Sequence, residues 1–146
     1  MAYAERNTWA QLIASLAGTI VYVVLVAPEL WRVPIDEVEW VWPMVWTVAG
    51  AIVLSIVLSI GWGILAGMRD PEETHTADQR DREIEWFGDR IGVAFLVIGA
   101  LGALVLAMLD VDTIWIGNAI FFGFFLSAFI GGIARLSAYR GGFPRW

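Results

Sequence analysis

The sequence predicts an all-α integral membrane protein, a four-helix bundle whose helices all cross the bilayer. Hydrophobic residues make up 59% of the 146 residues, a share too high for a soluble domain of this length. Long stretches also lack Asp, Glu, Lys, Arg and His, namely residues 9–28, 40–68, 91–109 and 113–134. Each stretch is close to the roughly 20 residues that a spanning helix needs, whereas spanning strands are about 9–11 residues long.

The chain is read as one transmembrane domain, 1–146, with an uncleaved first span. The predicted spans are residues 9–28, 42–67, 91–109 and 113–134, and the connection "LDVDTI" is short enough to make the last two spans antiparallel. An amphipathic loop, 29–41, joins the first two spans. In this loop Pro34 is expected to open a short helix that places Ile35, Val38 and Trp42 on one face.

The arginines predict which way the protein faces. All nine basic residues are Arg, and only Arg32 lies outside the N-terminus, the 69–90 segment and the C-terminus. Because Lys and Arg accumulate on the cytoplasmic side, both termini and the charged segment 69–90 are expected in the cytoplasm. This makes a multi-pass protein of the inner (plasma) membrane, and the exclusive use of Arg indicates a bacterial source. The net charge of −6 argues against nucleic acid as a partner.

Two segments near the predicted cytoplasmic edge resemble each other. The second span ends "SIGWGILAGMRD" and the fourth ends "FIGGIARLSAYRG", so both place glycines one to two turns before an arginine. This weak repeat predicts that the bundle consists of two tandem hairpins in parallel orientation.

Small residues recur at four-residue spacing along each span. Such stripes let helix backbones approach closely, and close packing helps helices to associate in lipid. The helix-packing candidates are Ser55, Ser59, Gly63, Gly67, Gly99, Ala103, Gly123, Ser127 and Gly131. The stripes serve packing within the chain, and a stripe left over serves a second copy or a membrane partner; the sequence leaves open which stripe that is.

The most polar part of the chain is "TADQRDREIEWFGDRIG", residues 76–92. Thr76 and Gln79 fit a capping box, which predicts one helix from about Ala77 to 109. Its first third is expected to extend into the cytosol or to bend at Gly88 along the membrane surface. The ionisable residues are Asp78, Arg80, Asp81, Arg82, Glu83, Glu85, Asp89 and Arg90. They are read as a solvated helix extension or as a contact surface for a partner or a sister subunit.

The residue types that carry most chemistry are missing or isolated. The chain has no Cys, no ionisable residue inside a predicted span, and no recognisable nucleophile–base pair, phosphate loop or zinc-protease motif. An enzyme is therefore not expected, and neither is a cofactor. His75 stands near Glu72, Glu73 and Asp78, but without repeated ligand spacing a solvated loop is favoured over a metal site. Asn118 is expected to form a hydrogen bond between helices, in a network open to Tyr22, Thr19 and Ser59.

Three motifs resemble a known family. "ADQRDREIEWFGDRIG" is similar to the DERD-x-x-I motif of a family of small four-helix membrane proteins of bacteria and archaea, and "ERNTWAQL" and "AYRGGF" resemble its chain ends. Gln79 stands where that motif has an acidic residue. The family has no assigned activity or cofactor, so the resemblance implies the fold.

These observations favour a structural or interaction subunit that contacts the lipid bilayer and forms a homo-oligomer or binds a membrane-complex partner. One alternative is a small oligomeric channel or transporter, with the acidic outer side attracting cations. Another is a membrane sensor that holds a soluble regulator through its charged cytoplasmic helix.

Overall fold

A computed structural model of the chain describes residues 3–69 and 79–141. Long helices dominate it: α1 (Tyr3–Val26), α2 (Val41–Arg69), α3 (Gln79–Met108) and α4 (Thr113–Gly141). Two short 3-10 helices, η1 (Glu29–Trp31) and η2 (Ile35–Glu37), lie between α1 and α2. All four long helices are long and apolar enough to cross a membrane. The predicted all-α fold with four candidate spans is confirmed for these residues.

The helices extend beyond the predicted spans at the polar side. α4 continues to Gly141 and α3 starts at Gln79, so both carry charged turns beyond their apolar stretches. α3 is a single helix through Gly88, as predicted, while the Thr76 cap lies outside the described residues. α1 ends at Val26, before Pro28. Helix length therefore follows backbone hydrogen bonding, which does not stop where the hydrophobic residues stop.

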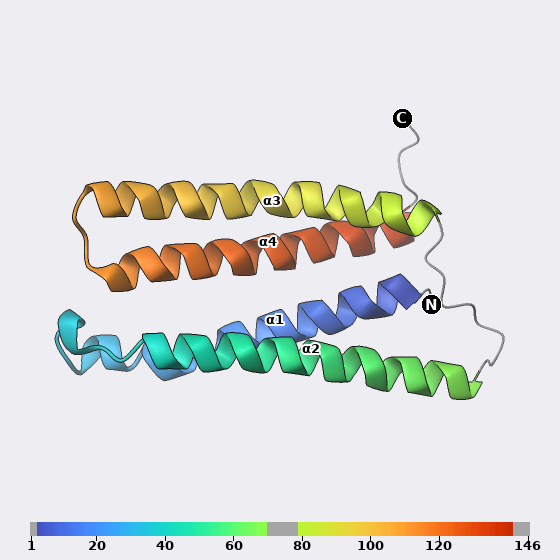
Figure 1. Cartoon of the computed structure of the whole chain (residues 1–146), viewed down its shortest axis with the longest axis horizontal. Helices are drawn as coiled ribbons and strands as arrows, with labels where there is room; N and C mark the ends of the chain where they lie inside the picture. The colour runs from blue at the N-terminus through green and yellow to red at the C-terminus, as the bar shows by residue number, and fades with distance from the viewer. Residues whose placement is uncertain (1–2, 70–78, 142–146) are drawn as a thin grey trace.

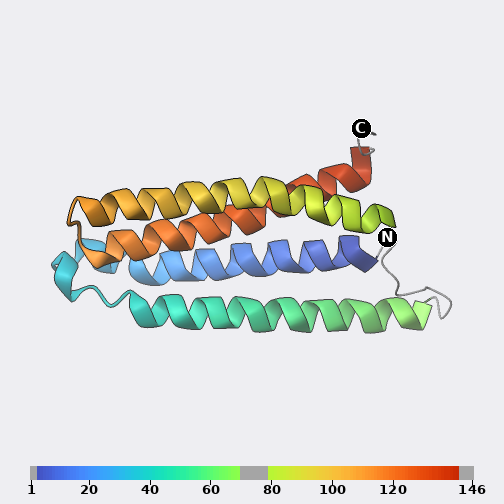
Figure 2. The ribbon, with the colours of Figure 1, turned by 45° about the horizontal axis from the view of Figure 1, so that its top comes forward.

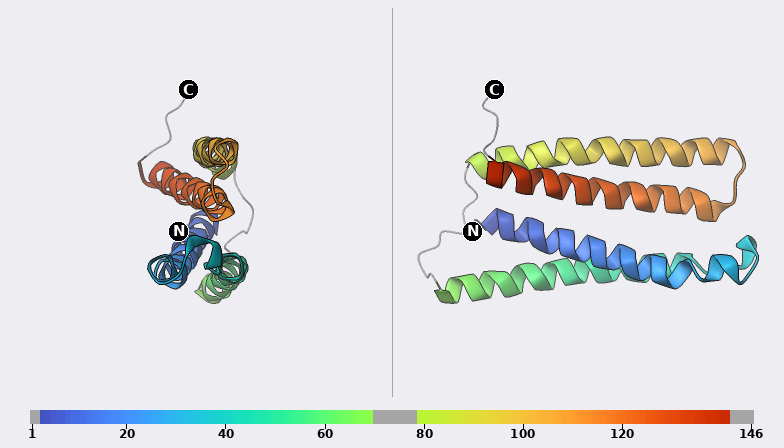
Figure 3. Two further views of the ribbon diagram at one scale, coloured as in Figure 1. Left: turned by 90° about the vertical axis from the view of Figure 1, so that its left-hand side faces the viewer. Right: turned by 180° about the vertical axis from the view of Figure 1, so that it is seen from behind.

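The long helices pack in the order α3, α4, α1, α2, with the most extensive contact between α3 and α4. Consecutive helices run antiparallel (Figures 1 and 2), and an end-on view shows α4 and α1 between the other two (Figure 3). At one end of the molecule lie the start of α1, the end of α2, the start of α3 and the end of α4. We call this the charged end, and the opposite end, with residues 27–40 and 109–112, the loop end.

Small residues set the spacing of α3 and α4. A Cβ atom on Gly99 would lie 2.6 Å from the Cα atom of Gly123, and one on Gly92 would lie 2.6 Å from the Ser127 carbonyl oxygen. Both distances are too short for a side chain, so the two backbones touch directly. Gly131 and the buried Ala103 continue the contact. Van der Waals packing of this kind stabilises helix pairs in lipid, where the hydrophobic effect does not drive helices together.

The connection between α3 and α4 is a tight helix ending. Asp110 has a φ of 55°, a left-handed conformation that Asp tolerates better than most residues. The Val111 N–H donates to the Leu106 carbonyl at 3.2 Å, and the Asp110 N–H to the Ala107 carbonyl at 3.2 Å. This is the hydrogen-bond pattern of a Schellman motif, which ends α3 and lets α4 begin at Thr113.

The segment between α1 and α2 covers the loop end of the bundle. η2 begins directly after Pro34, and Val38 is buried against a cluster of Tyr22, Val26 and Ile114. Ile35, Val38 and Trp42 do not lie on one helix as predicted, because η2 ends at Glu37 and Trp42 already belongs to α2. η2 is only three residues long, and Val38 is already extended (φ −67°, ψ 120°), so the helical register assumed for Trp42 is lost.

Trp40 packs on α4 at the loop end, whereas Trp42 is exposed. Gly117 of α4 lies so close to the Trp40 ring that a Cβ atom there would approach the ring carbons to 2.5 Å. The ring therefore rests directly on the α4 backbone and closes the loop end between α2 and α4.

Candidate functional site

Arg135 links helices at the charged end. Its Nη2 group forms an ion pair with the Asp89 carboxylate of α3, and its Nη1 group donates to Gln11 Oε1 of α1 at 3.3 Å. The side chain crosses α3 at Gly88, where the absence of a Cβ atom leaves room for it. Because the Arg135 side chain is 17% exposed and that of Asp89 57% exposed, solvent weakens the pair, and its main effect is to fix relative helix positions.

A second polar contact joins the same two helices. The Tyr139 hydroxyl donates to Asp81 Oδ1 at 3.2 Å. Tyr139 lies beyond the predicted span 113–134, and burial, followed by the nearby Asp81 carboxylate, raises its pKa above the ordinary value. The phenol therefore stays protonated and remains a donor at neutral pH.

The other charged residues of α3 are exposed. Gln79 Nε2 donates to Glu83 Oε1 at 3.4 Å, and the Arg90 guanidinium lies 5.2 Å from the centre of the Trp86 ring. Five exposed members of the predicted contact surface, which we call the charged face, are Arg80, Arg82, Glu83, Glu85 and Arg90; Asp89 is exposed as well but pairs with Arg135. Asp81 and Asp89 contact α4 instead, and Asp78 lies outside the described residues.

The hydrogen bond predicted for Asn118 is present. The Tyr22 hydroxyl of α1 donates to Asn118 Oδ1 at 2.8 Å, and Asn118 Nδ2 donates to the Ile114 carbonyl at 2.8 Å. Ser59 lies elsewhere and donates to Asn7 Oδ1 at 2.6 Å, which connects α2 to α1. In both contacts a hydroxyl and an amide oxygen from two different helices form a hydrogen bond with each other, so neither group is left unpaired.

α2 has the least covered surface. It packs extensively on α1 only, and Thr47 is its one buried side chain among those described. Its small-residue stripe partly faces α1, since a Cβ atom on Gly18 would lie 2.9 Å from the Ala51 Cβ atom. A Cβ atom on Gly63 would meet nothing within 4 Å. The surroundings of Gly67 are outside what the structure describes.

Two further glycines of α2 have open space beside them. A Cβ atom on Gly50 or on Gly61 would meet nothing within 4 Å. At 3.6 residues per turn the two lie on nearly the same side of the helix, together with the exposed Leu54 and Val57. We call these four residues the α2 outer face.

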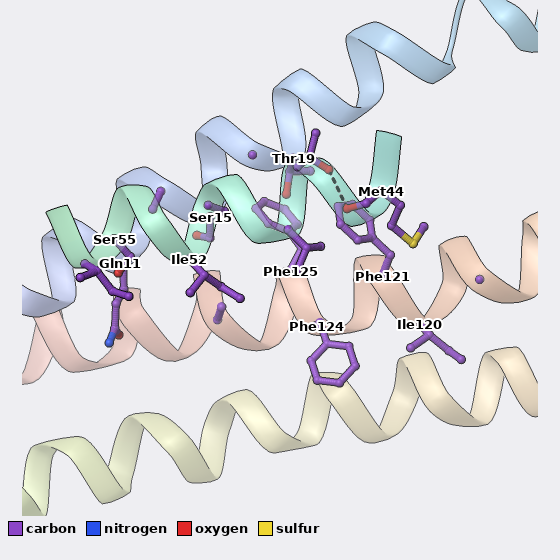
Figure 4. Close-up of a pocket in the computed structure, with 18 residues that line it drawn as sticks. Gln11, Ser15, Thr19, Met44, Ile52, Ser55, Ile120, Phe121, Phe124 and Phe125 are labelled. Atoms are coloured by element: carbon purple, nitrogen blue, oxygen red, sulfur yellow. Dashed lines mark hydrogen bonds between the residues drawn. The ribbon is translucent and has the colours of Figure 1, made fainter. Parts of the chain in front are cut away.

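A lateral cavity of about 630 Å³ lies between α2 and α4, with α1 as its floor. Figure 4 shows Phe121 and Phe125 of α4 directed toward α1 and α2, with Phe125 beside Ser15 and Thr19 and Phe121 beside Met44. The hydroxyls of Ser15 and Thr47 donate to carbonyls of their own helices, at 3.0 Å and 2.7 Å respectively. The cavity is therefore an apolar space in which these two hydroxyls are already satisfied.

The metal alternative for His75 falls on Glu72, Glu73, His75 and Asp78, all outside the described residues. Within residues 3–69 and 79–141, no three His, Cys, Asp or Glu side chains are grouped closely enough to hold a metal ion.

Comparison of the chain with protein-family models, with curated proteins and with solved structures finds no match. Function is therefore inferred from the contacts above. Sequence reasoning missed Gln11, Arg135 and the α2 outer face. The eleven-residue separation of Gly50 and Gly61 indicates that face, because eleven residues make about three helical turns. The search for four-residue spacing found the neighbouring stripe of Ser55, Ser59 and Gly63 instead.

Proposed function

We propose that the protein is a structural subunit of the membrane that self-associates through the α2 outer face. The observation that carries this proposal is the open space at Gly50 and Gly61 on the least covered helix. The interface would bring α2 of one copy against α2 of a second copy, because a symmetric dimer uses the same surface on both chains.

Glycine inside a helix has a cost that supports this proposal. In helix interiors Gly is about 0.8–1.0 kcal/mol less favourable than Ala. At Gly99 and Gly92 the neighbouring backbone explains the glycine, because any larger residue would collide. No described part of the chain approaches Gly50 or Gly61 in this way. Close approach of a further helix is the usual use of small residues within a membrane.

The proposed setting is the inner membrane of a bacterium, with the charged end in the cytoplasm. The arginine distribution supports this orientation. The antiparallel pairs α1–α2 and α3–α4 support an origin as two tandem hairpins, as do the similar ends of the second and fourth spans. The resemblance of residues 77–92 to the DERD-x-x-I motif supports membership of a four-helix membrane family without an assigned activity.

Substitution of the α2 outer face tests the assembly. Gly50→Leu combined with Gly61→Leu is expected to shift the monomer–dimer equilibrium toward monomer by about tenfold or more, equivalent to ~1.4 kcal/mol. Gly102→Leu on α3 is the matched control, because a Cβ atom there also meets nothing within 4 Å. Oligomer size is measured by native mass spectrometry. A wild-type monomer, or an unchanged dimer in the double variant, would refute the proposal.

The charged face favours a second function, a membrane sensor that holds a soluble regulator. Its five exposed side chains carry both signs and stand on a rigid helix at the charged end. Mixed charges of this kind select a complementary partner and speed its encounter more than they raise affinity. Asp81 is unsuitable for testing this function, since Tyr139 donates to it and a change there would also disturb the α3–α4 contact.

Charge reversal separates the sensor from the structural subunit. Arg82→Glu with Glu85→Arg is expected to lower retention of a cytosolic partner about tenfold, or ~1.4 kcal/mol, because each reversed charge repels its counterpart. Asp36→Arg with Glu37→Arg, two exposed positions at the loop end, is the control and should leave retention unchanged. The measurement is pulldown in mild detergent. Equal loss in both variants, or no partner with wild type, counts against the sensor.

A further inference from the structure

The lateral cavity between α2 and α4 is elongated along the helices. On α2 it extends from Met44 to Ile56, about 18 Å at a rise of 1.5 Å per residue. At the loop end it is lined by Gly117, on which the Trp40 ring rests. Toward the charged end, the Ser59–Asn7 hydrogen bond joins α2 to α1. The cavity therefore has the shape of a chain-like molecule and opens sideways, between α2 and α4.

The lining selects an apolar occupant. Phe121, Phe125 and Ile52 are among the side chains that line the cavity, and none of the described residues that line it is ionisable. The Ser15 and Thr47 hydroxyls are bonded to their own helices, which leaves Thr19, Ser55 and Gln11 as the other polar lining residues. With so few polar groups, the lining fits an apolar chain better than an ion. Apolar cavities of about 300–1,000 Å³ between the helices of a bundle are typical ligand sites.

One end of the cavity is polar. Gln11 lines it, and its Oε1 atom accepts a hydrogen bond from Arg135 at 3.3 Å. This contact orients the amide and leaves the Nε2 group as the remaining donor at the end of the side chain (Figure 4). A ligand that fits the apolar lining and the Gln11 donor has a long hydrocarbon chain with an acceptor oxygen at the end nearer Arg135.

We propose that the cavity binds one acyl chain of a membrane phospholipid, with the ester carbonyl next to Gln11. One leaflet contributes about half of the ~30 Å hydrocarbon core, so its acyl chains match the length of the cavity. Ester oxygens lie at the boundary of that core, and Gln11 lies near the charged turns of α1 and α4. The lipid enters sideways from the bilayer and fills space that the four helices leave open.

Filling the cavity tests this proposal. Ala128 lines it and is exposed, so Ala128→Phe places a ring where the chain would lie. The matched control is Ala100→Phe, at an exposed position of α3 outside the cavity. Ser55→Leu narrows the cavity from α2 and serves if Ala128→Phe does not fold. Phospholipid retained per chain is measured by native mass spectrometry after extensive detergent washing.

Wild type and Ala100→Phe are expected to retain one phospholipid per chain. Ala128→Phe and Ser55→Leu should bind it about tenfold more weakly, equivalent to ~1.4 kcal/mol. Equal retention in all variants, no retained lipid in wild type, or a retained neutral isoprenoid would overturn the proposal. A change of oligomer size instead of lipid content would also overturn it, since a second copy would then occupy the cavity. The Gly50 and Gly61 variants test self-association separately, because neither residue lines the cavity.

Discussion

Gly99→Leu is expected to lower the free energy of unfolding by about 3 kcal/mol or more. The Cβ atom would lie 2.6 Å from the Gly123 Cα atom and 3.1 Å from the Ala119 carbonyl oxygen. Both neighbours are backbone atoms of α4, so no side-chain rotation relieves the collision. The α3–α4 pair has to separate along the most extensive contact of the molecule.

Gly102→Leu is the control for this prediction. It lies one turn away on the same helix, with nothing within 4 Å of its Cβ position. Its unfolding free energy should equal that of wild type or exceed it by up to about 1 kcal/mol, because Gly is less favourable than a larger residue inside a helix. Denaturant unfolding in detergent micelles, followed by circular dichroism, measures both variants. Similar losses in the two would mean that Leu is harmful anywhere on α3 and that the Gly99–Gly123 approach has no special importance.

Gly117→Leu is expected to cost about 1–3 kcal/mol by displacing the Trp40 ring. The ring carbons lie 2.5 Å from the Cβ position, and a Trp side chain is rigid within its ring plane. Displacement exposes the apolar cluster around Tyr22 and Ile114, against which Trp40 packs. Trp40→Ala is expected to cost a similar amount through lost burial.

The double variant shows whether the two residues act through one contact. Once Trp40 is reduced to Ala, the leucine at position 117 no longer collides with a ring. The loss of unfolding free energy in the double variant should therefore be smaller than the sum of the two single losses, by about 1 kcal/mol or more. Unfolding free energies of the wild type, both single variants and the double variant give this coupling. Strict additivity would mean that Gly117→Leu acts on something other than Trp40.

Much of the charged end was predictable because helix formation there depends on local sequence. The continuous α3 and its charged turns follow from the apolar stripe and from the absence of Pro between residues 76 and 109. The partners of Asp81 and Asp89 were not predictable. Tyr139 and Arg135 lie far away in the sequence, and nothing in the local pattern separates these two carboxylates from the exposed Glu83 and Glu85.

The loop end shows the same limit at shorter range. Pro34 correctly predicts where a short helix begins, since proline fixes its own φ angle. Trp42 and Trp40 are two residues apart and chemically identical. Which of them packs depends on where η2 ends, and also on whether a glycine of α4 faces it.

The sequence by itself determined that the described chain is helical, with four apolar helices. In a bilayer core every backbone polar group has to be satisfied within its own segment, so hydrophobic length alone selects helices. Only the tertiary structure decided which glycines contact a neighbour and which remain open. Every helix has small residues on more than one side, and in lipid no hydrophobic stripe distinguishes the buried side from the exposed one. The contact order α3, α4, α1, α2 makes that distinction. It places Gly99 in a backbone contact and leaves Gly50 and Gly61 open on α2.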